Sequence, residues 1–260
     1  MMTSLVAARK YNHLRDVQLN QSWDGAGGDK AVYQSVSDNV GKRLGILGYG
    51  SIGRQVAKMA KVMGMDVIVH TANPRTTPES KRDNGYVVPG TGDPEGEVPS
   101  AWYSGQDKES LHQFLSQDID QLLVSVPLNN KTKYMLGKAE FDILSKRNAF
   151  IINVARGEIL VQDDLIEALH AFEDDSAGVL GEGRKGLRGA ALDVTTPEPL
   201  PKGHPLWTAP NCIVTPHMSG LSRDYAVRAL EVLEVNLERH AKGEKLVNLV
   251  NRETGYSSKI

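Results

Sequence analysis

Three glycines in one short loop constrain the fold of this chain more than any other feature. Gly48, Gly50 and Gly53 follow the order Gly-x-Gly-x-x-Gly, directly after the apolar run 44–47. Beyond the loop, apolar side chains recur at steps of four, three and four residues, at Ile52, Val56, Met59 and Met63. This spacing predicts a helix with one apolar face, and the apolar run 67–69 predicts the next strand. Strand, loop, helix and strand together predict a βαβ unit.

The alternation of strands and helices continues along the rest of the chain. Apolar runs predict further strands at 122–126, 149–154, 189–194 and 212–215. Helices are predicted at 108–115, 138–144, 162–171 and 223–242, with a leading helix within 1–20. Two polar stretches without apolar periodicity, near 76–106 and 173–185, are interpreted as insertions. The pattern predicts an α/β fold with a Rossmann-type, doubly wound parallel sheet and helices on both faces.

Composition limits the partners and the compartment that we expect. The net charge of −2 supplies no basic field for nucleic acid, and no apolar run reaches the length of a membrane helix. The single cysteine, Cys212, excludes a disulfide framework within the chain and fits a reducing compartment. We therefore expect a cytoplasmic protein without nucleic-acid or membrane partners. The ending Ser258-Lys259-Ile260 differs in one residue from the peroxisomal signal Ser-Lys-Leu, so the peroxisome is the alternative.

The glycine loop has the chemistry of a dinucleotide site. In such a loop the first glycine makes a tight turn, the second lets the backbone approach a pyrophosphate, and the third lets helix and strand pack closely. The following helix then presents free N–H groups and the positive end of its dipole to the phosphates. A tight turn without a ligand is the alternative, but the flanking strand and helix favour a nicotinamide dinucleotide.

The end of the second predicted strand indicates which dinucleotide is preferred. An Asp or Glu at this point normally binds the adenosine ribose hydroxyls of NAD. Thr71 occupies the position here and has no charge to repel a 2′-phosphate, and Arg75 can pair with that phosphate. The sequence therefore favours NADP. NAD stays open, with Arg75 as a solvated loop cation.

Four motifs in order resemble one known family, the D-isomer-specific 2-hydroxyacid dehydrogenases. They are the glycine loop, Val154-Ala155-Arg156-Gly157-Glu158, Ala191-Leu192-Asp193-Val194 followed by Glu198-Pro199, and Thr215-Pro216-His217. The resemblance extends from the first helix to about Asn251. It implies an oxidoreductase that transfers a hydride between NAD(P)H and a small 2-keto acid, as in glyoxylate and hydroxypyruvate reductases.

The resemblance also implies three catalytic residues. Arg156 would hold the substrate carboxylate and polarise the keto oxygen, Glu198 would be the acidic partner of the histidine, and His217 would donate the proton. The reaction needs such a set, because hydride reaches the carbonyl carbon while a proton must reach the oxygen, and histidine titrates closest to neutral pH. A solvated arginine, a surface carboxylate and a structural histidine are the respective alternatives.

Further residues would contact the cofactor, again by resemblance. Ser51 and Ile52 would touch the pyrophosphate, Pro127 the adenosine side, and Asp193 the nicotinamide carboxamide. The nicotinamide end would lie against Val154, Ala155, Arg156, His217, Ser219 and Gly220. We expect no metal site, because no group of His, Cys and carboxylate residues has ligand spacing.

The chain departs from the family pattern at its front. Family members normally carry a longer N-terminal portion that forms most of a substrate domain, and we expect this chain to retain only a remnant of it at its termini. We divide the chain into a leading helix on the dimer or substrate-domain side (1–20), the NAD(P)-binding domain (21–222) and a C-terminal helix and tail (223–260). The apolar tail 246–250 should then be exposed, and a homodimer would cover such surface.

Two other functions compete with the dehydrogenase. One is a dinucleotide-sensing binding protein, like the family's transcriptional corepressors. The other is a cofactor-domain fragment without activity. Arg156, Glu198 and His217 favour the enzyme over the sensor, because a sensor does not need a proton donor. The missing front portion favours the fragment.

Overall fold

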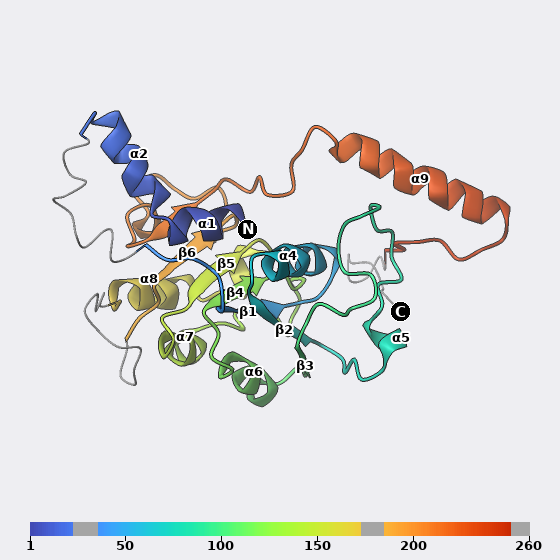
Figure 1. Cartoon of the computed structure of the whole chain (residues 1–260), viewed down its shortest axis with the longest axis horizontal. Coiled ribbons are helices and arrows are strands. Elements are labelled where there is room, and N and C mark those ends of the chain that lie inside the picture. The colour runs from blue at the N-terminus through green and yellow to red at the C-terminus, as the bar shows by residue number, and fades with distance from the viewer. Residues whose placement is uncertain (23–35, 173–184, 251–260) are drawn as a thin grey trace.

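The fold is a parallel sheet of seven strands, seen in a computed structural model that describes residues 1–22, 36–172 and 185–250 (Figure 1). The strands are β1 (Arg43–Leu47), β2 (Asp66–Thr71), β3 (Ala101–Ser104), β4 (Gln121–Val124), β5 (Phe150–Asn153), β6 (Gly189–Leu192) and β7 (Cys212–Val214). They lie in the order β3-β2-β1-β4-β5-β6-β7, and every neighbouring pair is parallel. The predicted Rossmann-type sheet is confirmed.

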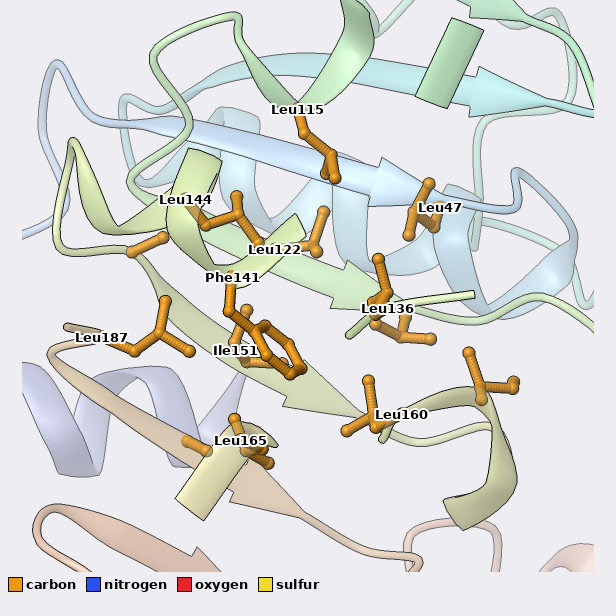
Figure 2. Packing of buried hydrophobic residues seen from close by; sticks show 14 of the residues in the cluster. Leu47, Leu115, Leu122, Leu136, Phe141, Leu144, Ile151, Leu160, Leu165 and Leu187 are labelled. Carbon is orange, nitrogen blue, oxygen red and sulfur yellow. The ribbon is translucent and has the colours of Figure 1, made fainter. Parts of the chain in front are cut away.

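Helices cover both faces of the sheet. The α-helices of the described residues are α1 (Met2–Ala8), α2 (Tyr11–Leu19), α4 (Ser51–Val62), α5 (Pro78–Lys81), α6 (Lys108–Leu115), α7 (Lys138–Ser145), α8 (Gln162–His170) and α9 (Tyr225–Ala241). One buried cluster joins α6, α7 and α8 to the sheet, and Figure 2 shows Leu122 and Ile151 of two strands in it, with Leu115, Phe141 and Leu165 of these helices. A second cluster, which includes Ile46 and Ala57, lies under α4 on the opposite face. Successive residues of a strand point to opposite faces of the sheet, so each cluster lies on one face. Both faces are therefore buried, as in a doubly wound sheet.

The strand order reverses between β1 and β4. β1 pairs with β2 on one side and with β4 on the other, so the connections run in opposite directions from this point. Ligands of such sheets bind in the crevice at the carboxyl ends of the strands at this reversal. The glycine loop follows β1 directly and therefore lies at this crevice.

Two predictions about local structure were wrong. The single leading helix is two helices, because Arg9 ends α1 and Lys10 takes a left-handed φ of 52° before α2. No glycine or proline marks this break. The stretch 76–106 contains the short helix α5 and the edge strand β3, which pairs with β2. β3 has only four half-buried residues, so it has no fully apolar run. The other predicted insertion falls largely outside the described residues, as do Ser258-Lys259-Ile260.

Helix α9 leaves an apolar surface uncovered. Figure 1 shows it standing away from the sheet and its helices. Its exposed apolar side chains are Tyr225, Val227, Leu230, Leu233 and Leu237. In the tail that follows, Leu246, Leu249 and Val250 are also exposed, which confirms the predicted apolar surface. Within the described residues, no helix combines the length and apolar character of a membrane span.

Candidate active site

All the predicted site residues lie at the carboxyl edge of the sheet. The glycine loop and the start of α4, with Ser51 and Ile52, follow β1; Thr71 and Arg75 lie at and after the end of β2; Pro127 follows β4; Val154, Ala155 and Arg156 follow β5; Asp193 and Glu198 follow β6; His217, Ser219 and Gly220 follow β7. Parallel strands bring their carboxyl ends to one edge, so the topology gathers these segments from across the chain.

The three glycines of the loop differ in what a side chain at each position would contact. Gly48 has a φ of +89°, and a Cβ on it would lie 2.9 Å from the carbonyl oxygen of Ser125. A Cβ on Gly53 would lie 2.5 Å from the carbonyl oxygen of Gly48. A Cβ on Gly50 would meet nothing within 4 Å. The fold itself therefore requires the first and third glycines, whereas the bare backbone at Gly50 leaves room for a ligand such as a pyrophosphate.

The loop is also braced from the neighbouring strand and helix. The Ser125 hydroxyl, just after β4, lies 2.8 Å from the carbonyl oxygen of Gly48 and 3.1 Å from that of Leu47. The amide of Gly48 donates to the carbonyl of His70 at 2.9 Å. Helix α4 begins immediately after its N-cap, Gly50, so the positive end of its dipole lies at the loop. These features fit a bound dinucleotide, whose phosphates need backbone donors at a helix N-terminus.

The end of β2 holds the two residues that favour NADP. The Thr71 hydroxyl donates to the carbonyl of Asn73 at 2.8 Å and closes the turn after the strand. The Arg75 guanidinium donates through Nη1 to the carbonyl of Ser80 at 2.7 Å. Ser80 lies in α5, which begins with a capping box between Thr77 and Ser80. A capped turn therefore anchors the side chain of Arg75.

The turn that carries Arg156 is built on a buried asparagine. Asn153, fully buried at the end of β5, donates through Nδ2 to the carbonyl of Arg156 at 2.9 Å. Its Oδ1 accepts from the amide of Ala155 at 3.0 Å. The Arg156 side chain is exposed, and its Nη1 donates to the carbonyl of Ala155 at 2.6 Å. In the described parts of the chain Arg156 forms no ion pair with Glu198.

Residues 195–198, here called the Glu198 strap, run close to the turn that holds Arg156. Gly157 lies so close to this strap that an added Cβ would stand 2.1 Å from the carbonyl oxygen of Thr195. The side chain of Gln162, at the start of α8, binds Thr196 twice, donating to its carbonyl at 2.6 Å and accepting from its amide at 3.0 Å. The Arg156 turn and the Glu198 strap are therefore held against each other.

Glu198 and His217 are in direct contact. The Nδ1 atom of the His217 ring is hydrogen-bonded to Oε1 of Glu198. His217 itself takes a left-handed φ of 48°, and its amide donates to the carbonyl of Asp193 at 2.8 Å. Both side chains are partly exposed at the sheet edge. The structure thus joins two residues that lie 19 positions apart in the sequence.

Asp193 organises the loop on which His217 stands. Its carboxylate accepts from the Thr215 hydroxyl at 2.6 Å, from the Met218 amide at 3.0 Å and from the Ser219 amide at 2.9 Å. Burial disfavours the charged carboxylate, but the hydrogen bonds from Ser219, Thr215 and Met218 outweigh it and hold the pKa of Asp193 below its ordinary value. The observed role is loop capping. Contact with a nicotinamide carboxamide stays a prediction.

Sequence reasoning missed Asn153, Gln162 and the bracing role of Ser125. Asn153 is a polar residue in the last two positions of the predicted strand 149–154, which is the one local signal that could have marked it. Gln162 acts on a residue 34 positions away, and Ser125 on the loop 77 positions before it, so no local pattern reveals either contact. In the described parts of the chain, no three His, Cys, Asp or Glu side chains are grouped to hold a metal ion.

Comparison with known proteins identifies the family. The sequence model of one protein family, described as "D-isomer specific 2-hydroxyacid dehydrogenase, NAD binding domain", matches residues 1–89 and 93–219 of this chain. The glyoxylate reductase of Aeropyrum pernix is 31% identical over 214 residues, which are 82% of this chain and 52% of the relative. The hydroxypyruvate reductase of Blautia hydrogenotrophica is 31% identical over 214 residues, 82% of this chain and 54% of the relative. The chain thus spans about half the length of these curated relatives.

Solved structures agree with the sequence comparison. The NADPH-dependent glyoxylate/hydroxypyruvate reductase of Sinorhizobium meliloti, solved with NADP and sulfate, superimposes with a TM-score of 0.63 at 26% identity. The superposition covers 98% of this chain and 71% of that one. The TT0316 protein of Thermus thermophilus has a TM-score of 0.67 at 28% identity, with 94% of this chain and 64% of that one covered. The chain belongs to the D-isomer specific 2-hydroxyacid dehydrogenase family and contains its NAD-binding domain.

Proposed function

We propose that this chain binds NAD(P)H and reduces a small 2-keto acid to the D-2-hydroxy acid. The observation that carries the proposal is the hydrogen-bonded pair of Glu198 and His217, which lies at the same sheet edge as the open backbone of Gly50. Relatives named glyoxylate reductase and hydroxypyruvate reductase support the same chemistry. Glyoxylate and hydroxypyruvate are therefore the first substrates to try, and oxidation of NADPH in their presence is the test.

Each residue of the set would make one contribution. When bound, the cofactor supplies the hydride. Arg156 would bind the substrate carboxylate through its planar guanidinium and stabilise the charge that develops on the keto oxygen. His217 would donate the proton to that oxygen from Nε2, because Glu198 engages Nδ1 and orients the ring. A dinucleotide sensor or an inactive fragment has no need of this pair.

We further propose that NADPH is the preferred cofactor. Replacing Thr71 by Asp places a carboxylate where the 2′-phosphate would lie, so the Kd for NADPH should rise about tenfold while NADH binding improves. Replacing Arg75 by Ala should weaken NADPH about tenfold through the loss of a charge-assisted bond and leave NADH unchanged. Titration of each variant with both reduced cofactors measures these effects.

Arg82, seven residues after Arg75 in the sequence, serves as the control. Arg82 pairs with Glu95 at 2.7 Å on the surface, and Arg82→Ala should leave both affinities unchanged. Equal losses for NADPH and NADH in Arg75→Ala, or a wild-type preference for NADH, would contradict the proposed cofactor preference.

A homodimer is the assembly that we propose, because the exposed apolar residues of α9 and the tail form a surface that a second copy could cover. The molar mass from light scattering distinguishes dimer from monomer. The cytoplasm is the compartment that we propose, since the only cysteine of the sequence, Cys212, fits a reducing environment.

A further inference from the structure

The second residue of the glycine loop is tied to a distant segment. Tyr49 is 7% exposed, and its hydroxyl donates to Oδ2 of Asp93 at 2.6 Å. Asp93 is 6% exposed and lies in residues 81–98, here called the brace segment, which belongs to the stretch predicted as an insertion. The same carboxylate accepts from the amides of Glu97 and Val98, both at 3.1 Å. A buried carboxylate therefore joins the fold of the brace segment to the loop.

Arg54, at the start of α4, strengthens the junction. Its guanidinium donates to the carbonyls of Asp93 and Lys81 at 2.5 and 2.6 Å, and its Nε lies 3.5 Å from Oδ2 of Asp83. The guanidinium carbon also lies 4.8 Å from the centre of the Tyr49 ring. Buried charges are costly unless they are paired and hydrogen-bonded, and the partners of Arg54 come from both ends of the brace segment.

The contacts continue along the outer side of α4. The amide of Gly92 donates to Gln55 Oε1 at 2.6 Å, and Lys58 Nζ donates to the carbonyl of Gly90 at 2.9 Å. Trp102 of β3 meets the Tyr49 ring edge-on, with 5.1 Å between ring centres. The brace segment thus packs beside the phosphate loop and its helix.

The brace segment also reaches the other predicted phosphate contact. Arg54 holds the carbonyl of Lys81, and Arg75 holds the carbonyl of Ser80, the preceding residue of α5. One short helix therefore links the residue expected to bind the 2′-phosphate with the helix expected to bind the pyrophosphate.

Burying a tyrosine hydroxyl costs free energy, and packing alone does not require the hydroxyl. Burial and the hydrogen bond to Asp93 raise the pKa of Tyr49 well above its ordinary value, so the hydroxyl keeps the proton that it donates to Asp93. An apolar ring would fill the same space without needing a partner. The hydrogen bond of the hydroxyl adds a fixed orientation for two peptide units. One joins Gly48 to Tyr49, and the other joins Tyr49 to Gly50.

We propose that Asp93 is a positioning residue for the cofactor: by holding the Tyr49 hydroxyl, it fixes the backbone between Gly48 and Gly50 against which the pyrophosphate binds. This inference rests on the proposed function and deepens it. It assigns a role in cofactor affinity to Asp93, one residue of the brace segment.

Tyr49→Phe tests the inference with the smallest change. The variant keeps the ring and its contact with Trp102 but loses the donor to Asp93. The Kd for NADPH should rise about fivefold, the factor that corresponds to the loss of one hydrogen bond of about 1 kcal/mol. Binding of adenosine 2′-monophosphate, which has no pyrophosphate, should be unchanged when measured by displacement of NADPH.

Two further variants make the experiment specific. Asp93→Ala should weaken NADPH at least as much, and the double variant should be no weaker than the worse single variant, because both changes remove the same hydrogen bond. Tyr86→Phe is the matched control, since Tyr86 lies in the brace segment but its hydroxyl donates to Glu231, at 2.8 Å. It should bind NADPH like the wild type.

The outcomes separate this inference from the proposed function. Unchanged NADPH affinity in Tyr49→Phe would overturn the inference alone. Equal weakening of NADPH and adenosine 2′-monophosphate would also overturn it, because that result indicates a general loss of structure. A wild-type chain that binds neither NADPH nor NADH would overturn the proposed function and this inference together.

Discussion

Replacing Gly50 by valine should abolish dinucleotide binding without lowering the stability of the chain. Gly50 has φ −88° and ψ −162°, an extended conformation that valine adopts readily. Apart from the two chain neighbours, an added Cβ meets no protein atom within 4 Å, so the protein alone leaves space beside this residue. The valine side chain would fill the space that a pyrophosphate needs. Calorimetric titration with NADPH and thermal unfolding without cofactor measure the two halves of this prediction.

The third glycine of the loop provides the contrasting variant. A Cβ at Gly53 would stand 2.5 Å from the carbonyl oxygen of Gly48, so Gly53→Ala must push helix and loop apart. Overpacking of this kind costs about 1–3 kcal/mol, and the melting temperature should fall. If Gly50→Val binds NADPH like the wild type, the open space at Gly50 is not the pyrophosphate site.

Replacing His217 by alanine should slow turnover far more than it weakens cofactor binding. The imidazole is the proposed proton donor to the keto oxygen, and removing a positioned acid typically costs a factor of about 10²–10⁴ in rate. The Kd for NADPH should rise by no more than the loss of one predicted nicotinamide contact, because the glycine loop and its braces do not depend on this ring. Initial rates with glyoxylate at saturating NADPH, together with a binding titration, give both quantities.

Two variants calibrate the histidine experiment. Glu198→Gln preserves the size of the side chain but removes the carboxylate that binds Nδ1, so its rate should fall less than that of His217→Ala. His170 is exposed at the end of α8, and His170→Ala should turn over like the wild type. A rate for His217→Ala equal to that of His170→Ala would rule out His217 as the proton donor.

The main architecture could be predicted because it depends on local periodicity. The apolar runs of β1, β4 and β5 are fully buried in the sheet, and buried parallel strands leave that signature in the sequence. The glycine loop was recognisable because its three glycines stand between a strand and an amphipathic helix. β3 escaped prediction because a short edge strand needs neither a long apolar run nor strict alternation.

The bracing of the site could not be predicted, because it depends on contacts between distant residues. Gln162 binds the backbone of Thr196, and Tyr49 binds Asp93. In the sequence Gln162 is only a polar residue at the start of a predicted helix, Tyr49 an unspecified position of the glycine motif, and Asp93 an acidic residue in a polar stretch. Only the packing of the brace segment against α4 shows that the stretch 76–106 supports the phosphate loop.

The most direct test of the central claim is the oxidation of NADPH by the wild-type chain and by His217→Ala, with glyoxylate or hydroxypyruvate as acceptor. We expect the wild type to oxidise NADPH in the presence of at least one of these acids. His217→Ala should still bind NADPH but react at least about 10²-fold more slowly. Binding of NADPH by both proteins with no difference in turnover would contradict the account.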